Sequence, residues 1–358
     1  NNIVGMDASI LMHPKVWEAS GHVDNFHDPL VDNKISKKRY RLDHLLEDQS
    51  ESIIDELINK LTIKEGIDLE ATIQAIVASL LEIEESSGAI IIECGVIDPH
   101  TKEVGDWTNT RQFNLMFKTK MGATTDASSV LYLRPETAQG IFVNFLNVQK
   151  TAHMKIPFGI AQIGKAFRNE IVARQFIFRM REFEQMEMQF FVRPGEEMKW
   201  YEYWKDFRMK WHNSLGMGED NYRFHDHDKL AHYADAAADI EFKFPFGFKE
   251  LEGIHSRTDF DLKAHQEYSG KKLQYFDSEL GKSYVPYVVE TSIGLDRMFL
   301  AVLSHSFREE ELENGESRVV LKIPAVIAPI KAAILPLTKK DGMPQKAREI
   351  MKSLQIDF

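Results

Sequence analysis

Two patterns of hydrophobic and polar residues divide the chain. Between Leu42 and Gly88, apolar residues recur at spacings of three and four, as they do along the buried face of an amphipathic helix. From Ile90 onwards the spacing changes to two, which is typical of half-buried β-strands. Because the strand-like segments follow one another through short connections or single helices, the pattern predicts an α+β fold with an antiparallel sheet flanked by helices. Strands are expected at 112–117, 130–133, 158–170, 178–192, 240–242, 248–252 and 284–291, and helices at 137–150 and 198–215.

The two ends of the chain carry other patterns. Residues 7–17 predict a short helix that leads into an extended loop. After Gly315, a proline-containing linker leads to a buried strand expected at 332–337 and a helix near 345–354. The expected units are a large domain over 1–324, a helical insert within it at about 42–88, and the truncated beginning of an α/β domain over 325–358.

The composition narrows the class of protein. With 358 residues, 43% of them hydrophobic, the chain is long enough to bury a large core. Its single cysteine, Cys94, excludes an internal disulfide and a Cys-paired zinc site, so we expect no zinc and a reducing compartment, which favours the cytoplasm. No apolar stretch is long enough to span a membrane as a helix.

The net charge of −11 at pH 7 by itself argues against a nucleic-acid partner. The charge is unevenly distributed, however. Between Leu42 and Gly88 there are twelve acidic residues and two lysines, so a net charge of −10 belongs to this insert and about −1 to the rest of the chain. A solvated helix face explains the acidic residues of the insert, and the remaining chain is close enough to neutral to meet a polyanion.

One predicted hairpin concentrates charge on one face. Because alternate side chains of a strand share a face, Arg168 and Glu170 lie together on its first strand. A charged face of this kind can bind a ligand, or it can be the ordinary solvated face of an antiparallel sheet. On the second strand, the residues that share a face are Arg179, Arg181, Phe183, Gln185, Glu187 and Gln189, and the apolar set on the opposite face is Phe178, Met180, Met186, Met188 and Phe190.

A second unusual feature lies where the strand that ends at Gly294 gives way to an amphipathic helix. Arg297 falls in the first turn of this helix, where the helix dipole disfavours a cation unless an anion shares the site. A phosphate-bearing ligand would resolve the conflict, and a plain helix start capped by Asp296 is the alternative interpretation. At the mouth of another predicted helix, Glu136 stands next to Pro135, which suits a helix start.

Taken together, these residues resemble a class II aminoacyl-tRNA synthetase, and within that class the homodimeric glycyl-tRNA synthetases. Residues 167–170 with the strand that follows resemble motif 2, residues 294–297 resemble motif 3, and residues 6–29 resemble the motif 1 region that forms the dimer interface of the family. The resemblance implies a class II catalytic domain, followed from about 325 by an anticodon-binding domain. The segments typical of the glycyl branch are 111–117, 134–140 and 250–254.

The resemblance implies a ligase, a glycine–tRNA ligase, that joins glycine to ATP with release of pyrophosphate and passes the glycyl group to the 3' end of tRNA(Gly). By resemblance, Arg168 and Arg297 would be catalytic: Arg168 would hold the α-phosphate, and Arg297 would pack on the adenine and reach the γ-phosphate. Phe183 would stack on the other face of the adenine, Glu170 would contact its edge, and Glu250 would help to hold Mg²⁺. The ATP-binding residues implied in this way are Arg168, Asn169, Glu170, Phe178, Arg179, Met180, Arg181, Glu182, Phe183, Glu250, Leu251, Gly294, Leu295, Asp296 and Arg297.

The resemblance also implies carboxylates around the ammonium group of glycine, and it assigns this role to Glu136, Glu187 and Glu290. A small pocket rejects larger amino acids by steric exclusion, so no editing site is expected. Arg41 matches a substrate-contacting arginine of the family, but it could equally be a surface arginine. The implied glycine-binding residues are Arg41, Glu136, Phe183, Glu184, Gln185, Met186, Glu187, Glu290, Thr291, Ser292, Ile293 and Gly294.

The expected partners are therefore glycine, ATP with Mg²⁺, tRNA(Gly) and a second copy of the chain bound through the motif 1 region, without a membrane. The acidic insert is expected to face away from the tRNA. The alternative is a catalytically inactive, synthetase-like dimer that binds nucleic acid. Such a protein is expected to have lost the ATP-contacting arginines and the acidic residues of the glycine pocket, and this chain has both. A synthetase for another small amino acid is disfavoured by the glutamate-rich pocket.

Overall fold

The protein is built around one seven-stranded sheet with the strand order β1-β8-β9-β15-β12-β11-β10. The computed structural model describes residues 2–64, 66, 68–83, 85–122, 130–173, 175–227 and 234–355. The pairs in this sheet are antiparallel except for β1 with β8, so the predicted α+β fold with an antiparallel sheet is confirmed. The strands are β1 Ile3–Gly5, β8 Phe158–Phe167, β9 Glu182–Val192, β10 Tyr222–Asp226, β11 Ala236–Phe244, β12 Gly247–Thr258 and β15 Tyr287–Gly294.

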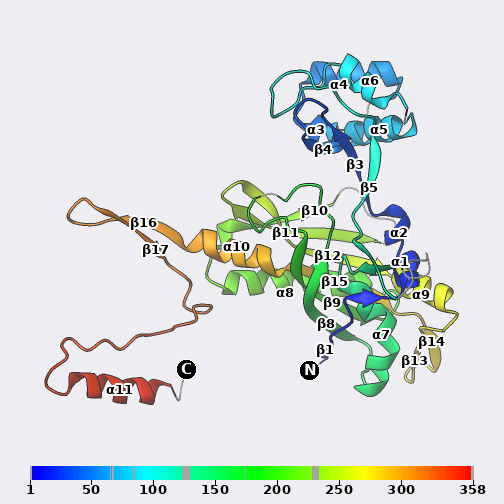
Figure 1. Cartoon of the computed structure of the whole chain (residues 1–358). Coiled ribbons are helices and arrows are strands. Elements are labelled where there is room, and N and C mark those ends of the chain that lie inside the picture. Colours follow the sequence, from blue (N-terminus) through cyan, green and yellow to red (C-terminus); the bar gives the residue numbers. More distant parts are fainter. Residues whose placement is uncertain are drawn as a thin grey trace.

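Helices cover both faces of the central sheet (Figure 1). Phe190 of β9 packs with α8 and α10 on one face, and the next residue, Phe191, packs with α7 and α9 on the other. This division follows from the alternation of side chains along a strand. The helices predicted at 137–150 and 198–215 are confirmed within one residue at each end. The four helices are α7 Ala138–Thr151, α8 Glu197–Ser214, α9 Phe260–Ser269 and α10 Leu295–Ser306.

The insert forms a second body with its own core, joined to the rest of the chain by β3 and β5 (Figure 1). Its core includes Leu57, Ile76 and Trp107, none more than 1% exposed. The acidic residues Asp55 and Glu70 are exposed, as expected for a solvated face; Glu65 and Glu84, which belong to the same acidic set, lie outside the described residues. The elements are β3 His27–Asp32, β4 Arg39–Arg41, α3 Leu42–Glu47, α4 Glu51–Leu61, α5 Leu69–Glu82, α6 Ser87–Glu93 and β5 Arg111–Asn114.

Short elements near the N-terminus and beside the central sheet complete the larger body. The helix predicted at 7–17 begins later than expected, because its first turn is set by Pro14, a residue suited to a helix start, and the preceding residues pair as strand β2. The remaining elements are β2 Leu11–Met12, α1 Pro14–Ala19, α2 His22–Asn25, β6 Lys118–Lys120, β7 Val130–Leu133, β13 Tyr275–Asp277 and β14 Lys282–Tyr284, together with a 3₁₀ turn at Glu219–Asn221.

The predicted charged hairpin ends earlier than expected. β8 stops at Phe167 and β9 begins at Glu182, so the residues between them form a loop. The backbone N–H of Arg168 donates to the carbonyl oxygen of Arg181 (2.9 Å), and the Arg181 Nε–H donates to the carbonyl oxygen of Glu170 (2.9 Å). The first bond keeps the β8–β9 register for one more pair, but the regular strands end there. The predictions that Arg168 and Glu170 share a face of the first strand, and that Arg179 and Arg181 share a face of the second strand with Phe183, are therefore wrong.

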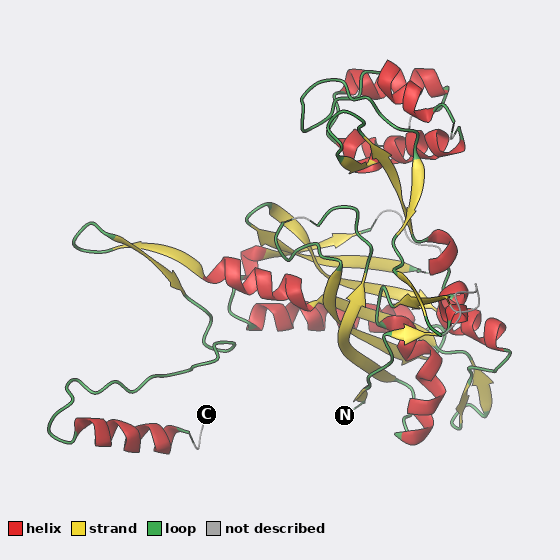
Figure 2. Cartoon of the chain, in the orientation of Figure 1, coloured by secondary structure: helices red, strands yellow, loops and turns green. Residues whose placement is uncertain are grey.

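The C-terminal part leaves the body as a two-stranded ribbon and ends in one separate helix (Figure 2). The buried strand predicted at 332–337 is wrong: the segment is irregular, and Leu335 and Leu337 are 84% and 89% exposed. An apolar segment becomes a buried strand only where another strand completes its hydrogen bonds, and in the described residues none pairs with it. The helix predicted near 345–354 is confirmed. The elements are β16 Phe307–Glu311, β17 Ser317–Leu321 and α11 Met343–Leu354.

Across the part of the chain that the structure describes, no helix combines the length and the apolar character needed to cross a membrane.

Candidate active site

A cavity of about 240 Å³ lies on the central sheet, over strands β9, β12 and β15. Its walls are completed by the loop between β8 and β9, by the first turn of α10 and by Glu136, just before α7. These segments are far apart in the sequence. The sheet therefore brings motif 2, motif 3 and the segment around Glu136 to one place.

Alternation along the strands decides which side chains reach this cavity. On β9, Gln185 and Glu187 line it, whereas Met186 packs in the core with α8 and α10. The register places Ser292 of β15 opposite Glu187 of β9, so these two residues meet in the floor. Leu251 and Ile293 are buried in the same core as Met186, and Thr291 lies between cavity residues on the other face of β15.

The structure brings most of the expected site residues together around the cavity. The expected residues that line it are Glu136, Arg168, Glu170, Phe178, Arg179, Met180, Phe183, Glu184, Gln185, Glu187, Glu250, Glu290, Ser292, Gly294, Asp296 and Arg297. The expected residues that do not line it are Arg41, Asn169, Arg181, Glu182, Met186, Leu251, Thr291, Ile293 and Leu295.

At one end of the cavity, arginines lie against aromatic rings. The guanidinium of Arg168 lies 5.3 Å from the ring centre of Phe183 and 5.6 Å from that of Phe26. Its Nε–H donates to the carbonyl oxygen of Pro135 (3.1 Å). Within the described residues, no carboxylate is close enough to form an ion pair with Arg168. Its charge is therefore held in place without being neutralised.

Arg297 is held at the same end in a similar way. It lies in the first turn of α10, as the sequence predicted, with its guanidinium 4.3 Å from the ring centre of Phe178. Its Nη1 is 3.2 Å from Glu250 Oε2 and also donates to the carbonyl oxygen of Glu250 (3.1 Å). Burial alone would raise the pKa of the Glu250 carboxyl, but Arg297 lowers it below its ordinary value. Asp296, beside it, accepts a hydrogen bond from the backbone N–H of Glu184 (2.8 Å) and so ties α10 to β9.

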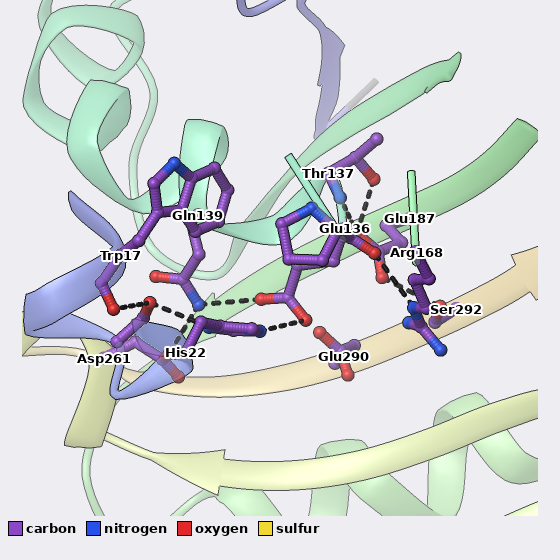
Figure 3. Close-up of polar contacts among 12 residues, drawn as sticks. Trp17, His22, Glu136, Thr137, Gln139, Arg168, Glu187, Asp261, Glu290 and Ser292 are labelled. Atoms are coloured by element: carbon purple, nitrogen blue, oxygen red, sulfur yellow. Dashed lines mark hydrogen bonds and ion pairs between the residues drawn. The ribbon is translucent and has the colours of Figure 1, made fainter. Parts of the chain in front are cut away.

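At the other end, the cavity contains buried carboxylates. Glu187 accepts hydrogen bonds from the backbone N–H of Thr137 (3.0 Å), from the Thr137 hydroxyl and from the Ser292 hydroxyl (2.9 Å) (Figure 3). These donors are all neutral. Among the described residues, no basic side chain pairs with Glu187. Burial, together with the nearby charges of Glu290 and Glu136, raises the pKa of Glu187 to about 7.

The neighbouring carboxylates Glu136 and Glu290, in contrast, have basic partners. Glu290 lies 3.3 Å from the guanidinium of Arg257 and 3.0 Å from Nδ1 of His255. Glu136 lies 3.4 Å from Nε2 of His22. Burial would raise the pKa of both carboxyls, but these cationic and hydrogen-bonding neighbours lower it instead. Among the described residues, Glu187 is thus the one of the three with no basic side chain at ion-pair distance.

The lining residues His255 and Arg257 were missed by the sequence analysis, together with Gly253 and Ile177. The predicted strand ended at residue 252, whereas β12 continues to Thr258. If the strand had been extended, the period of two would have placed Gly253, His255 and Arg257 on one face. Nothing in the sequence indicated that this face meets the glutamates of β9 and β15.

Arg41 lies in a neighbouring cavity that it shares with Glu170 and Arg179. Its guanidinium is 3.2 Å from Asp28 Oδ1 and 2.7 Å from Asp43 Oδ2. Burial would raise the pKa of the Asp43 carboxyl, but the hydrogen bond and charge of Arg41 lower it. Arg41 therefore links the start of the insert helix α3 to the motif 1 segment, apart from the central cavity.

Residues that could hold a metal are few. In the described ranges, no group of three or more His, Cys, Asp or Glu side chains has the geometry to bind a metal ion by itself. Mg²⁺ in nucleotide sites commonly uses only one or two carboxylates and takes its other ligands from phosphates and water. The carboxylate of Glu250, beside Arg297 at the arginine-rich end, fits that donor set.

Comparison with known protein families assigns both parts of the chain to tRNA synthetases. Residues 117–306, slightly more than half of the chain, match the family described as tRNA synthetase class II core domain (G, H, P, S and T). Residues 28–115 match the family described as glycyl-tRNA synthetase insertion domain 1. The first range contains all the residues that line the cavity, and the second contains the core of the insert.

Curated proteins named glycine–tRNA ligase match nearly the whole chain. The protein of Chlorobaculum tepidum is 53% identical over 368 residues, which cover 100% of this chain and 75% of that protein. The protein of Macrococcus caseolyticus is 50% identical over 99% of this chain and 72% of its own length. The protein of Thermus thermophilus is 49% identical over 95% of this chain and 69% of its own length. The chain therefore belongs to the glycine–tRNA ligase family of class II aminoacyl-tRNA synthetases.

Proposed function

We propose that this chain activates glycine with ATP to glycyl-adenylate and pyrophosphate, and then transfers glycine to the 3' end of tRNA(Gly). The observation that carries the proposal is the charge arrangement of the cavity. An end with two arginines on aromatic rings adjoins an end whose buried Glu187 has no cationic partner among the described residues. The first end suits a nucleotide, and the second suits a small ammonium compound.

The activation step needs positioning and charge neutralisation more than proton transfer. A glycine carboxylate oxygen attacks the α-phosphorus of ATP, the bond from this phosphorus to the bridging oxygen of the β-phosphate breaks, and pyrophosphate leaves with that electron pair. The attacking carboxylate is already a nucleophile at pH 7, so no general base is required. Arg168 is placed to hold the α-phosphate and the attacking carboxylate, and Arg297 to reach the terminal phosphate. Phe183 and the guanidinium of Arg297 would enclose the adenine.

Glycine would be held by its ammonium group at the carboxylate end. Glu187 supplies the charge that no other group nearby neutralises, and Glu136, Glu290 and the Ser292 hydroxyl complete the surroundings. Two of these three carboxylates already have basic neighbours. The ammonium therefore brings the cation that the arrangement lacks. A pocket closed around glycine would reject larger amino acids by steric exclusion.

Mg²⁺ is proposed as the metal, with Glu250 as its protein ligand beside the ATP phosphates. When bound, the ion would neutralise negative charge on the phosphates. We also propose a homodimer through residues 6–29 and a cytoplasmic location, which the single cysteine of the chain supports.

The direct experiment is glycine-dependent exchange of radiolabelled pyrophosphate into ATP. We expect exchange with glycine, and none with alanine or serine at the same concentration. Absence of exchange with every amino acid, together with binding of tRNA, would support the inactive nucleic-acid-binding alternative. Exchange that is faster with alanine or serine than with glycine would overturn the substrate assignment but keep the reaction class.

A further inference from the structure

We infer that His22 is a positioning residue of the glycine site: it holds the Glu136 carboxylate in the cavity as an anion turned toward the substrate. The inference rests on the proposed function. His22 Nε2 lies 3.4 Å from Glu136 Oε2, and Figure 3 shows the imidazole directed at this carboxylate. His22 comes from α2, within residues 6–29, and not from the segments that resemble motif 2 and motif 3. The two side chains are only 15% and 16% exposed.

The orientation of His22 is set from several sides. Its ring packs edge-on against Trp17, with 5.7 Å between ring centres, and against Phe26, with 5.3 Å. The Ser20 hydroxyl lies 2.8 Å from Nδ1. The preceding residue, Gly21, has φ of +77°, a left-handed conformation that glycine adopts without strain, and this turn starts α2 at His22. Because Ser20 occupies Nδ1, only Nε2 remains to donate to Glu136.

The second carboxylate oxygen of Glu136 is held by a hydrogen bond from Gln139. Gln139 donates from its amide nitrogen to Glu136 Oε1 (2.9 Å) and to Asp261 Oδ1 (3.0 Å). The Gln139 carbonyl oxygen lies 2.6 Å from His265 Nε2, which fixes the amide orientation. Gln139 thus contacts one carboxylate oxygen of Glu136, and His22 contacts the other. Removal of His22 leaves one oxygen without its donor in a buried site, where a carboxylate then favours its protonated form.

The ATP end should be insensitive to this change. His22 touches Phe26, and Phe26 in turn lies against Arg168, so the substitution has to keep an apolar side chain against the Phe26 ring, as His22→Leu does. A loss through His22 should therefore appear as weaker glycine binding at unchanged ATP binding. General damage to the fold would weaken both substrates together and lower the temperature of unfolding.

The test measures KM for glycine and for ATP in pyrophosphate exchange with the full chain. For His22→Leu we expect the glycine KM to rise about tenfold or more, the usual effect of removing one hydrogen bond to a charged group, with the ATP KM within about twofold. His22→Gln, whose amide can donate in place of Nε2–H, should recover most of the loss. Ser20→Ala should shift the glycine KM in the same direction by a smaller factor.

The matched control is His100→Gln, an exposed histidine of the insert that lies outside the cavity and outside residues 6–29, which should leave both KM values unchanged. An unchanged glycine KM in His22→Leu would overturn the inference. So would an equal rise of both KM values with no recovery in His22→Gln. Lack of exchange by the wild-type protein would instead contradict the proposed function, so the two failures can be told apart.

Discussion

The two ends of the cavity hold charge in different ways. At the ATP end, Arg168 and Arg297 lie on aromatic faces and bond to backbone carbonyl oxygens. At the glycine end, Glu136 and Glu290 are tied to His22 and Arg257. At the first end Arg297 is paired with Glu250, and the charge of Arg168 is left for a ligand to neutralise. At the second end Glu136 and Glu290 are paired within the protein, and the charge of Glu187 is left for a ligand.

The chemistry of the side chains explains the difference. A guanidinium is weakly hydrated and packs on an aromatic face. The free protein can therefore hold it without a phosphate at little cost in folding free energy. A buried carboxylate without a partner is costly, and Glu136 and Glu290 each have a basic neighbour that holds them in the cavity as anions. We therefore expect substitutions at the ATP end to reduce activity without loss of stability, and substitutions at the glycine end to affect both.

The largest effect is expected for Arg168→Ala. Loss of a group that stabilises charge developing at the α-phosphate should reduce kcat/KM in pyrophosphate exchange by about 10³-fold. The midpoint of thermal unfolding should hardly change, because Arg168 has no ion-pair partner among the described residues. Arg168→Lys keeps the positive charge but not the planar guanidinium, so its kcat/KM should lie between those of Arg168→Ala and the wild-type protein. A large fall in the unfolding temperature of Arg168→Ala would contradict the expected difference between the two ends of the cavity.

Arg257→Met should act mainly on stability. It leaves Asp261, 2.9 Å from Arg257 Nε, and Glu290 without their shared cation in a buried site, which costs about 3 kcal/mol or more. Scanning calorimetry should show a clear fall in the unfolding temperature. Arg318→Met removes an exposed ion pair with Glu310 and serves as the control, with a cost of about 1 kcal/mol or less. Equal shifts in the two variants would contradict the role of Arg257.

Glu187→Gln should separate the two ends most cleanly. The change keeps the shape of the side chain but removes the charge that the ammonium needs, so the glycine KM should rise by about 10–100-fold. The ATP KM should stay within about twofold. Glu202→Gln, on the exposed side of α8, is the matched control and should change neither value. Equal loss of glycine and ATP binding would mean that Glu187 is structural.

The smallest effect is a pH dependence of glycine binding. Because the pKa of Glu187 is raised to about 7, the free protein carries its proton below that pH and must release it when the ammonium binds. The glycine KM should therefore rise as the pH falls, by about tenfold between pH 8 and pH 6. At the ATP end the pKa of the Glu250 carboxyl is lowered instead, mainly by the charge of Arg297, so this carboxyl does not take up a proton in that range. In Glu187→Gln the slope should disappear; a slope that persists would assign it to another group.

Local rules predicted part of this site and failed on the rest. The helix-dipole argument singled out Arg297, and the structure places it in the first turn of α10 beside the cavity. Strand alternation placed Glu187 on the charged face of its strand, and the family resemblance assigned Glu187 and Ser292 to the glycine site; both line the cavity. The partners of these residues could not be predicted in this way, because Arg257 and His22 reach the carboxylates from segments distant in sequence. The strand expected at 332–337 failed for the same reason, since a strand depends on a neighbour that the local pattern does not specify.

The amino-acid sequence by itself determined the helices of the insert, the alternating strands of the sheet and the identity of the charged residues, because periodicity and local backbone preferences are properties of short segments. Only the tertiary structure decided how the charges are shared. The register between β9 and β15 places Ser292 opposite Glu187, and the turn at Gly21 brings His22 to Glu136. Which carboxylate keeps a free negative charge depends on distances of a few ångströms between remote segments, and the fold alone sets those distances.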